Sequence, residues 1–172
     1  RVLVNGLMKQ GYDVKMSEVH GMSQRGGSVS TQVRWGDHVY SPLIGKGEAD
    51  LLVAFEEMEA VRYAEYLKPG AIAVINNYRQ DSSLTAAGLA EYPEGCVEAM
   101  QKHFKCFTLK AEAIARELGS VKCTNIVLFG AMTEALDLGD IDWEEVIKET
   151  VPPKFADLNI QAYRRGKEAA KK

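Results

Sequence analysis

The spacing of apolar positions switches repeatedly between the periods of a helix and a strand. Residues Arg1 to Gln10 fit a helix that stops at Gly11, a residue type common just after helix ends. Apolar side chains then alternate from Tyr12 to Val19, as they do in a half-buried strand. The chain is therefore predicted to open with a helix followed by a strand.

A hairpin is predicted next. The apolar segments Ser28 to Trp35 and His38 to Ile44 flank Gly36-Asp37, which has the composition of a two-residue turn. This spacing predicts that the two segments pair as antiparallel strands.

A parallel unit follows the hairpin. Asp50 to Phe55 is continuously apolar after its first residue, and Ala71 to Asn76 is a second apolar run, as in strands covered on both faces. Between them, Glu56 to Leu67 has helical spacing and ends before Pro69-Gly70. Strand, helix and strand in this order predict a right-handed crossover in a parallel sheet.

The second half of the chain continues the alternation after an irregular surface segment, residues 77–95. Thr124 to Leu136 is apolar nearly all round, which favours a buried helix, although Ile126 to Phe129 alone also fits a strand. The other predicted elements are a helix at Cys96 to His103, an edge strand at Cys106 to Leu109, and helices at Ala111 to Leu118, Trp143 to Thr150 with Asp142 as cap, and Phe155 to Lys171. Together they predict a single three-layer α/β/α domain over residues 1–172, with a mostly parallel sheet and an antiparallel hairpin.

Composition excludes several classes of protein. The 172 residues are 46% hydrophobic and 26% charged, which fits one compact domain. The formal charge of -3 and the scattered basic residues argue against binding to nucleic acid. No apolar run approaches the roughly 20 residues that a membrane span needs, so we expect a cytoplasmic protein.

Metal and cofactor motifs are missing from the sequence. Cys96, Cys106 and Cys123 are far apart and form no paired C-x-x-C spacing, and the three histidines are equally dispersed. The glycine-rich phosphate loops, the G-x-S-x-G elbow and H-E-x-x-H are all absent from the sequence. We therefore expect no metal and no redox cofactor in this chain, and we assign it no catalytic residue.

One loop stands out, because polar donors and glycines crowd it directly after a predicted strand, where α/β folds place ligand sites. Its glycines permit close approach of another surface, and Gln24 and Arg25 offer planar, multidentate hydrogen bonding. A plain connector with a solvated Arg25 is an equal alternative on these grounds alone. The candidate residues are His20, Gly21, Met22, Ser23, Gln24, Arg25, Gly26, Gly27 and Ser28.

The sequence around this loop resembles a known family. The strings EVHGMSQRGGSVSTQVRWGDHVYSPLI, from Glu18 to Ile44, and GEADLLVAFEEMEAVRY, from Gly47 to Tyr63, are similar to the gamma domain of 2-oxoacid:ferredoxin oxidoreductases. The histidine and methionine of the motif look most like the indolepyruvate branch. One departure is that members of this family normally begin with a strand and a G-x-G-G-Q-G turn, which this sequence lacks before Arg1.

The resemblance implies the small subunit of an enzyme that oxidatively decarboxylates aryl pyruvates, such as indolepyruvate, to aryl-acetyl-CoA while reducing ferredoxin. Thiamine diphosphate and the iron–sulfur clusters would belong to a large alpha subunit, the expected partner. The loop from His20 to Ser28 would then lie at the subunit interface or on the coenzyme A side, with Arg25 as a contact for a phosphate or an acidic residue. Two alternatives remain: a relative acting on pyruvate, 2-oxoglutarate or branched 2-oxoacids, and a non-enzymatic α/β binding module.

Overall fold

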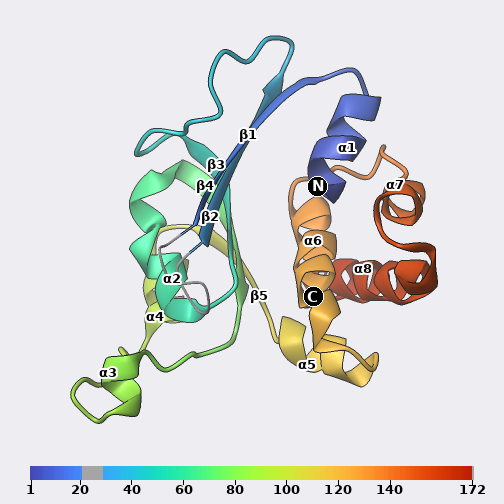
Figure 1. Cartoon of the computed structure of the whole chain (residues 1–172). Helices are drawn as coiled ribbons and strands as arrows, with labels where there is room; N and C mark the ends of the chain where they lie inside the picture. The colour runs from blue at the N-terminus through green and yellow to red at the C-terminus, as the bar shows by residue number, and fades with distance from the viewer. Residues whose placement is uncertain (21–28, 172) are drawn as a thin grey trace.

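The computed structural model describes residues 1–20 and 29–171 and has three layers (Figure 1). A parallel sheet of order β3-β4-β5 lies between two layers of helices. Its strands are β3 (Ala49–Ala54), β4 (Leu67–Asn76) and β5 (Lys105–Leu109). The predicted α/β class, with a parallel sheet and an antiparallel pair, is confirmed.

Successive residues of β4 enter different apolar cores, as the period of a strand requires. Ala73 and Ile75 pack in the core under α2 and α4, whereas Val74 packs in the core under α6 and α8. The run from Ala71 to Asn76 is continuously apolar up to its last residue because helices cover both faces of the strand.

The helical layers differ in length and composition. On one face lie α2 (Glu57–Arg62) and α4 (Cys96–Gln101), and on the other α6 (Thr124–Ala135) and α8 (Ala156–Ala170). Eight consecutive residues of α6 from Ile126 to Thr133 are buried, which explains its unbroken apolar pattern and confirms that it is a helix. The remaining helices are α1 (Val2–Lys9), α3 (Ser83–Ala86), α5 (Ala111–Glu117) and α7 (Trp143–Thr150), with 3₁₀ turns at Ala64–Tyr66, Val121–Cys123 and Pro153–Phe155.

The antiparallel pair contains a different strand from the one predicted. Strand β2 (Val29–Gly36) pairs with β1 (Asp13–His20) along its whole length, from Asp13 opposite Gly36 to His20 opposite Val29. The predicted hairpin across Gly36-Asp37 is therefore wrong, and residues 38–44 form no strand.

Side chains hold the 38–44 segment where a strand ladder was expected. The Asp13 carboxylate accepts from the amide of Val39 at 2.9 Å, and the Gln32 side chain accepts from the amide of Ile44 at 2.7 Å. Arg34 donates to the carbonyl of Leu43 at 2.9 Å. Pro42 has no amide hydrogen to give to a ladder. The segment therefore follows β2 without pairing with it.

Two other predicted boundaries shift. The helix expected over Glu56 to Leu67 ends at Arg62, and Pro69-Gly70 lies inside β4, where the pairing register with β3 shifts. The surface segment 77–95 is irregular as predicted, apart from the four residues of α3. Within the described residues, no helix is both long and apolar enough to cross a bilayer.

Candidate functional site at the carboxyl edge of the sheet

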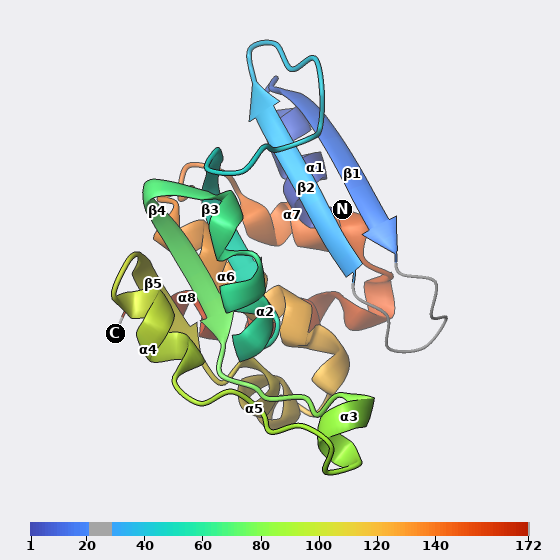
Figure 2. The ribbon, with the colours of Figure 1, turned by 90° about the vertical axis from the view of Figure 1, so that its left-hand side faces the viewer.

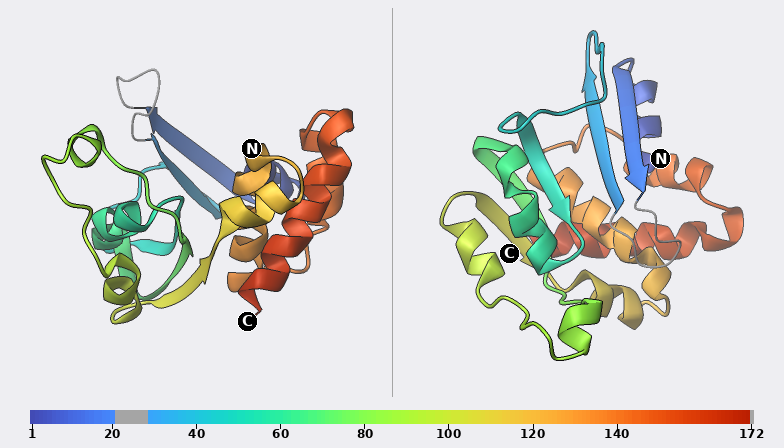
Figure 3. Two further views of the ribbon diagram at one scale, coloured as in Figure 1. Left: turned by 90° about the horizontal axis from the view of Figure 1, so that it is seen from below. Right: turned by 60° about the vertical axis from the view of Figure 1, so that its left-hand side comes forward.

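Parallel pairing brings the carboxyl ends of three strands to one edge of the sheet. Strands β3, β4 and β5 end at Ala54, Asn76 and Leu109 and all run in the same direction. Figures 2 and 3 show β1 pointing the same way, so its carboxyl end lies at the same end of the molecule. In α/β folds this edge is the usual place for ligands and reacting groups.

Asn76 holds the three strand ends together. Its side chain is buried, with 3% of its surface exposed. Its amide nitrogen donates to the carbonyl of Phe55 at 3.1 Å, and its amide oxygen accepts from the backbone of Ala111 at 2.9 Å. The segments that leave β3 and β5 are therefore both fixed to the last residue of β4.

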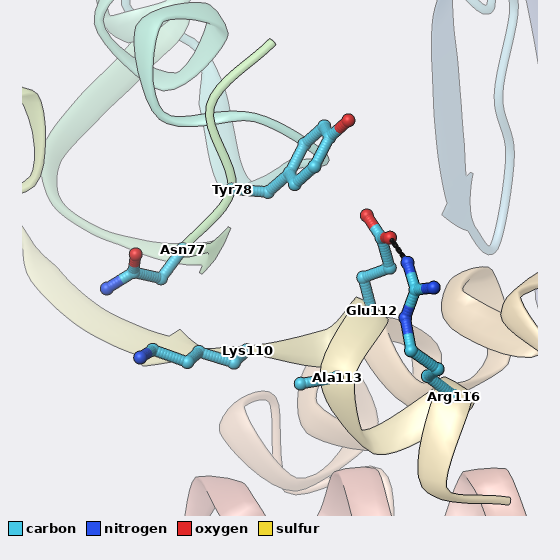
Figure 4. A pocket seen from close by; sticks show the side chains of 6 residues that line it. All are labelled: Asn77, Tyr78, Lys110, Glu112, Ala113 and Arg116. Carbon is cyan, nitrogen blue, oxygen red and sulfur yellow. Dashed lines mark hydrogen bonds and ion pairs between the residues drawn. The ribbon is translucent and has the colours of Figure 1, made fainter.

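A hollow of about 210 Å³ opens beside this junction (Figure 4). Its wall combines an aromatic ring, an amide, two cations and one acid. Arg116 donates to Glu112 at 2.5 Å across one helical turn, and no ion-pair partner of Lys110 is seen among the described residues. The lining residues are Asn77, Tyr78, Lys110, Glu112, Ala113 and Arg116.

Two adjacent acids follow β3 and are buried, which is unusual for glutamate. Glu56 is 8% exposed, and its carboxylate accepts from the amides of Glu59 at 3.0 Å and Gln80 at 3.4 Å. Tyr92 also donates its hydroxyl to Glu56, while that hydroxyl accepts from the amide of Met58 at 3.0 Å. Burial, with the Glu56 carboxylate nearby, raises the pKa of Tyr92, which keeps the hydroxyl a donor.

Glu57 takes part in a second arrangement centred on Arg79. The Arg79 guanidinium donates to Glu57 at 3.1 Å and, through its other two nitrogens, to both oxygens of Glu94 at 2.9 and 3.0 Å. It also lies over the ring of Tyr92, 5.2 Å from the centroid. The hydrogen bonds and the positive charge of Arg79 hold the pKa of Glu94 below its ordinary value. We call Glu56, Glu57, Arg79, Tyr92 and Glu94 the edge clamp.

The loop predicted as a site lies mostly outside the described residues. This applies to Gly21, Met22, Ser23, Gln24, Arg25, Gly26, Gly27 and Ser28. His20 is the last residue of β1 and stands opposite Val29 in the ladder. His20 and Val29, which flank the other loop residues, are thus adjacent, at the end of the molecule where β3 and β4 also end (Figure 2).

Known proteins identify the family. The family model described as pyruvate ferredoxin/flavodoxin oxidoreductase matches residues 1–169. The chain belongs to this family. It is 42% identical to the indolepyruvate oxidoreductase subunit IorB of Pyrococcus horikoshii, over 95% of this chain and 84% of that protein. The IorB subunit of Thermococcus kodakarensis is 39% identical over the same shares.

Solved structures of this oxidoreductase family share the fold. The gamma subunit of a keto/oxoacid ferredoxin oxidoreductase from Geobacter sulfurreducens matches with a TM-score of 0.67 and 22% identity, over 99% of this chain and 88% of that one. The 2-oxoglutarate:ferredoxin oxidoreductase of Magnetococcus marinus, solved with 2-oxoglutarate, coenzyme A and succinyl-CoA bound, also matches at 0.67 and 22%. There the match covers 99% of this chain but 28% of that chain, so the same fold is one part of a longer polypeptide.

The cysteines of this oxidoreductase subunit do not fit an iron–sulfur cluster. Cys96 and Cys123 are buried and Cys106 is half-buried, and burial raises the pKa of all three thiols. A raised pKa opposes the thiolate form that binds metal. The described residues contain no group of three or more histidine, cysteine, aspartate or glutamate side chains that could hold a metal ion.

Proposed function

We propose that this chain is the small subunit of an indolepyruvate:ferredoxin oxidoreductase. The complex would convert aryl pyruvates to aryl-acetyl-CoA by oxidative decarboxylation, with the electrons passed to ferredoxin. The observation that supports this assignment is the 42% identity, over 95% of the chain, to a subunit named for indolepyruvate. A subunit KorC of a 2-oxoglutarate synthase is only 28% identical over 88% of the chain.

The cofactors of the reaction would reside in a large partner subunit. Thiamine diphosphate would supply the carbanion chemistry and iron–sulfur clusters the electron path, while this chain would contribute binding surface at its carboxyl edge. The dispersed cysteines, two of them buried and one half-buried, support this division. We therefore propose that the chain is inactive alone and is located in the cytoplasm with its complex.

Reconstitution with the large subunit from the same organism tests the assignment. The complex should reduce ferredoxin with indolepyruvate and coenzyme A, and faster than with pyruvate or 2-oxoglutarate. The isolated chain should be colourless and inactive with every 2-oxoacid. A preference for 2-oxoglutarate would favour the KorC-like alternative, and a chain that forms no complex would favour the non-enzymatic binding module.

The loop from His20 to Ser28 is proposed to touch coenzyme A or the partner, with Arg25 as the main contact. Arg25→Ala should leave the isolated chain folded and reduce coenzyme A affinity or activity of the complex. A charge-assisted hydrogen bond contributes roughly 1.5–3 kcal/mol, which corresponds to about a 10- to 150-fold change.

Arg25→Lys serves as the matched control for that variant, because lysine keeps the charge and loses the planar fork. It should not restore function. Coenzyme A-dependent ferredoxin reduction, with thermal melts of the isolated variants, measures both. Full activity of the alanine variant would remove Arg25 from the site, and loss of the fold would make it structural.

A further inference from the structure

Residues 79–94, which we call the edge loop, close on themselves at the base. Arg79 and Glu94, the first and last residues, are joined by two parallel hydrogen bonds of 2.9 and 3.0 Å. Tyr92 and Arg79 then fasten this base to Glu56 and Glu57 at the sheet edge. A compact surface loop with adjacent ends is often a functional element.

The tip of the loop is ordered by its own hydrogen bonds. The hydroxyl of Ser82 accepts from the amide of Thr85 at 3.2 Å, at the start of α3. The amide of Leu89 donates back to the carbonyl of Leu84 at 2.9 Å, and that of Gly88 to Thr85 at 3.0 Å. Figures 1 and 2 show α3 at the tip of a loop that extends away from the rest of the molecule.

Apart from the half-buried Tyr92 at its base, this ordered loop buries little within the chain. As far as the structure describes the chain, neither apolar core includes a residue from 79–94. Leu84 and Leu89 are instead 56% and 76% exposed. Ordering a loop costs conformational entropy, and burying two leucines on another surface would offset that cost. The exposed leucines therefore favour a contact with a surface outside this chain.

Charge around the tip indicates the nature of that contact. Asp81 and Glu91 are exposed, and neither has an ion-pair partner among the described residues. Glu94, by contrast, is already neutralised by Arg79. A complementary surface would have an apolar pocket for the leucines and basic side chains around it.

We propose that the edge loop is a docking element for the large subunit, with Leu84 and Leu89 as apolar anchors and Asp81 and Glu91 as the acidic rim. This inference rests on the proposed function, which supplies the partner. It adds a specific interface element, distinct from the loop at His20 to Ser28. Phe55, 53% exposed, and Tyr78, 38% exposed, follow β3 and β4 and are further exposed aromatic side chains at this edge of the sheet.

Binding to the purified large subunit of the same organism tests the proposal. The double variant Leu84→Asp/Leu89→Asp should bind at least about tenfold more weakly, as expected when central anchors are lost. Leu43→Asp is the matched control, since Leu43 is 62% exposed. It belongs to the segment between β2 and β3, which lies at the other end of the molecule from α3 (Figure 1). The affinity of this control variant should stay within about twofold of wild type.

Two further measurements separate docking from folding. All isolated variants should melt like the wild type, because the substituted side chains are exposed. Hydrogen exchange at the amides of Gly88 and Leu89 should slow when the large subunit is added.

The acidic rim is tested by a separate variant. Asp81→Asn/Glu91→Gln should weaken binding less than the leucine variant does, and it should reduce the salt dependence of binding.

Each outcome decides between the alternatives. Unchanged affinity of the leucine double variant overturns the docking proposal and leaves the proposed function intact. Failure of the wild-type chain to bind the large subunit overturns both. A wild-type homodimer that the leucine variant dissociates, with binding to the large subunit unchanged, would make a second copy of this chain the occupant of the surface and would also overturn the proposal.

Discussion

Two regions of the molecule join distant segments by opposite means. The helices α6 and α8 meet through glycines: a side-chain carbon added at Gly166 would lie 1.9 Å from the carbonyl oxygen of Val127, and one added at Gly130 would lie 2.1 Å from that of Tyr163. The edge clamp instead joins the edge loop to the residues that follow β3 through long charged and aromatic side chains.

The difference separates the part of the molecule that holds the fold from the part that is available for contacts. Backbones in direct contact leave no room for another atom, so the helix crossing tolerates no larger residue. The clamp lies partly in solvent, where Arg79 and Glu94 contribute little to global stability. It fixes the position of the edge loop, and its loss should affect the loop more than the fold.

Substitution at the helix crossing should have the largest effect. Gly166→Ala forces a methyl group against the backbone of α6, so the helices must separate. We expect a loss of about 3 kcal/mol or more in the free energy of unfolding, at the upper end of overpacking effects. Urea unfolding followed by circular dichroism measures it.

Gly139→Ala is the control for that experiment, because nothing lies within 4 Å of the added carbon. It should change stability by no more than about 0.5 kcal/mol. Equal stability of the two variants would show that α6 and α8 can move apart freely. The helix crossing would then not be the part of the molecule that holds the fold.

Removal of one hydroxyl from the clamp should have a smaller effect. Tyr92→Phe deletes the donor to Glu56 and the acceptor for Met58, while Glu56 keeps its two backbone donors. We expect the free energy needed to open the edge loop to fall by about 1–2 kcal/mol. Hydrogen exchange should detect this change as faster exchange of the edge-loop amides, while the amides of α6 and α8 exchange as in the wild type.

Tyr40→Phe is the matched control, since Tyr40 is 97% exposed. It should exchange and melt like the wild type. If Tyr92→Phe behaves in the same way, the Tyr92 hydroxyl does not hold the edge loop in place.

The sequence predicts the buried part of the fold well. Continuous apolar runs predicted β3, β4 and α6: the run is half-buried in β3 and buried in the second half of β4 and in most of α6, and such burial leaves a strong pattern. The hairpin at Gly36-Asp37 was wrong because Asp13, Gln32 and Arg34 bind the backbone of the 38–44 segment. Such contacts between side chain and backbone have no periodic signal.

The candidate site could be predicted only in part. Glu56 and Glu57 come just after the apolar strand β3, a position at which α/β folds place functional groups, so their sequence context offered a signal. Arg79 and Tyr92 lie in an irregular segment, and their contacts with these acids span 22 and 36 residues. The role of the loop from His20 to Ser28 stays a prediction.

Low pH should weaken ion pairs in the helices and at the edge with different consequences, and this is the smallest of the three effects predicted here. Arg164 joins α8 to Glu144 of α7 at 2.8 and 2.6 Å, and Arg79 joins the edge loop to Glu94. Both contacts hold the pKa of the glutamate below its ordinary value. A group with a lowered pKa in the folded state stabilises the fold at neutral pH and loses that contribution as pH falls below about 4.3, the value in the unfolded chain.

Glu144→Gln should therefore lower the melting temperature at pH 7 by only about 1–2 °C, as for one exposed ion pair. This difference in melting temperature between variant and wild type should shrink as the pH falls from 5 to 3. Glu94→Gln should leave the global melting temperature unchanged across this range, because the clamp fixes a loop outside both cores. Its effect should appear instead as faster exchange of edge-loop amides at pH 7. Melting curves at stepped pH, with carboxyl titration of both glutamates by NMR, separate the two cases. If Glu94→Gln loses more global stability than Glu144→Gln, the edge clamp holds the fold as well as the edge loop, and the proposed contrast between the edge and the helices α6 to α8 is wrong.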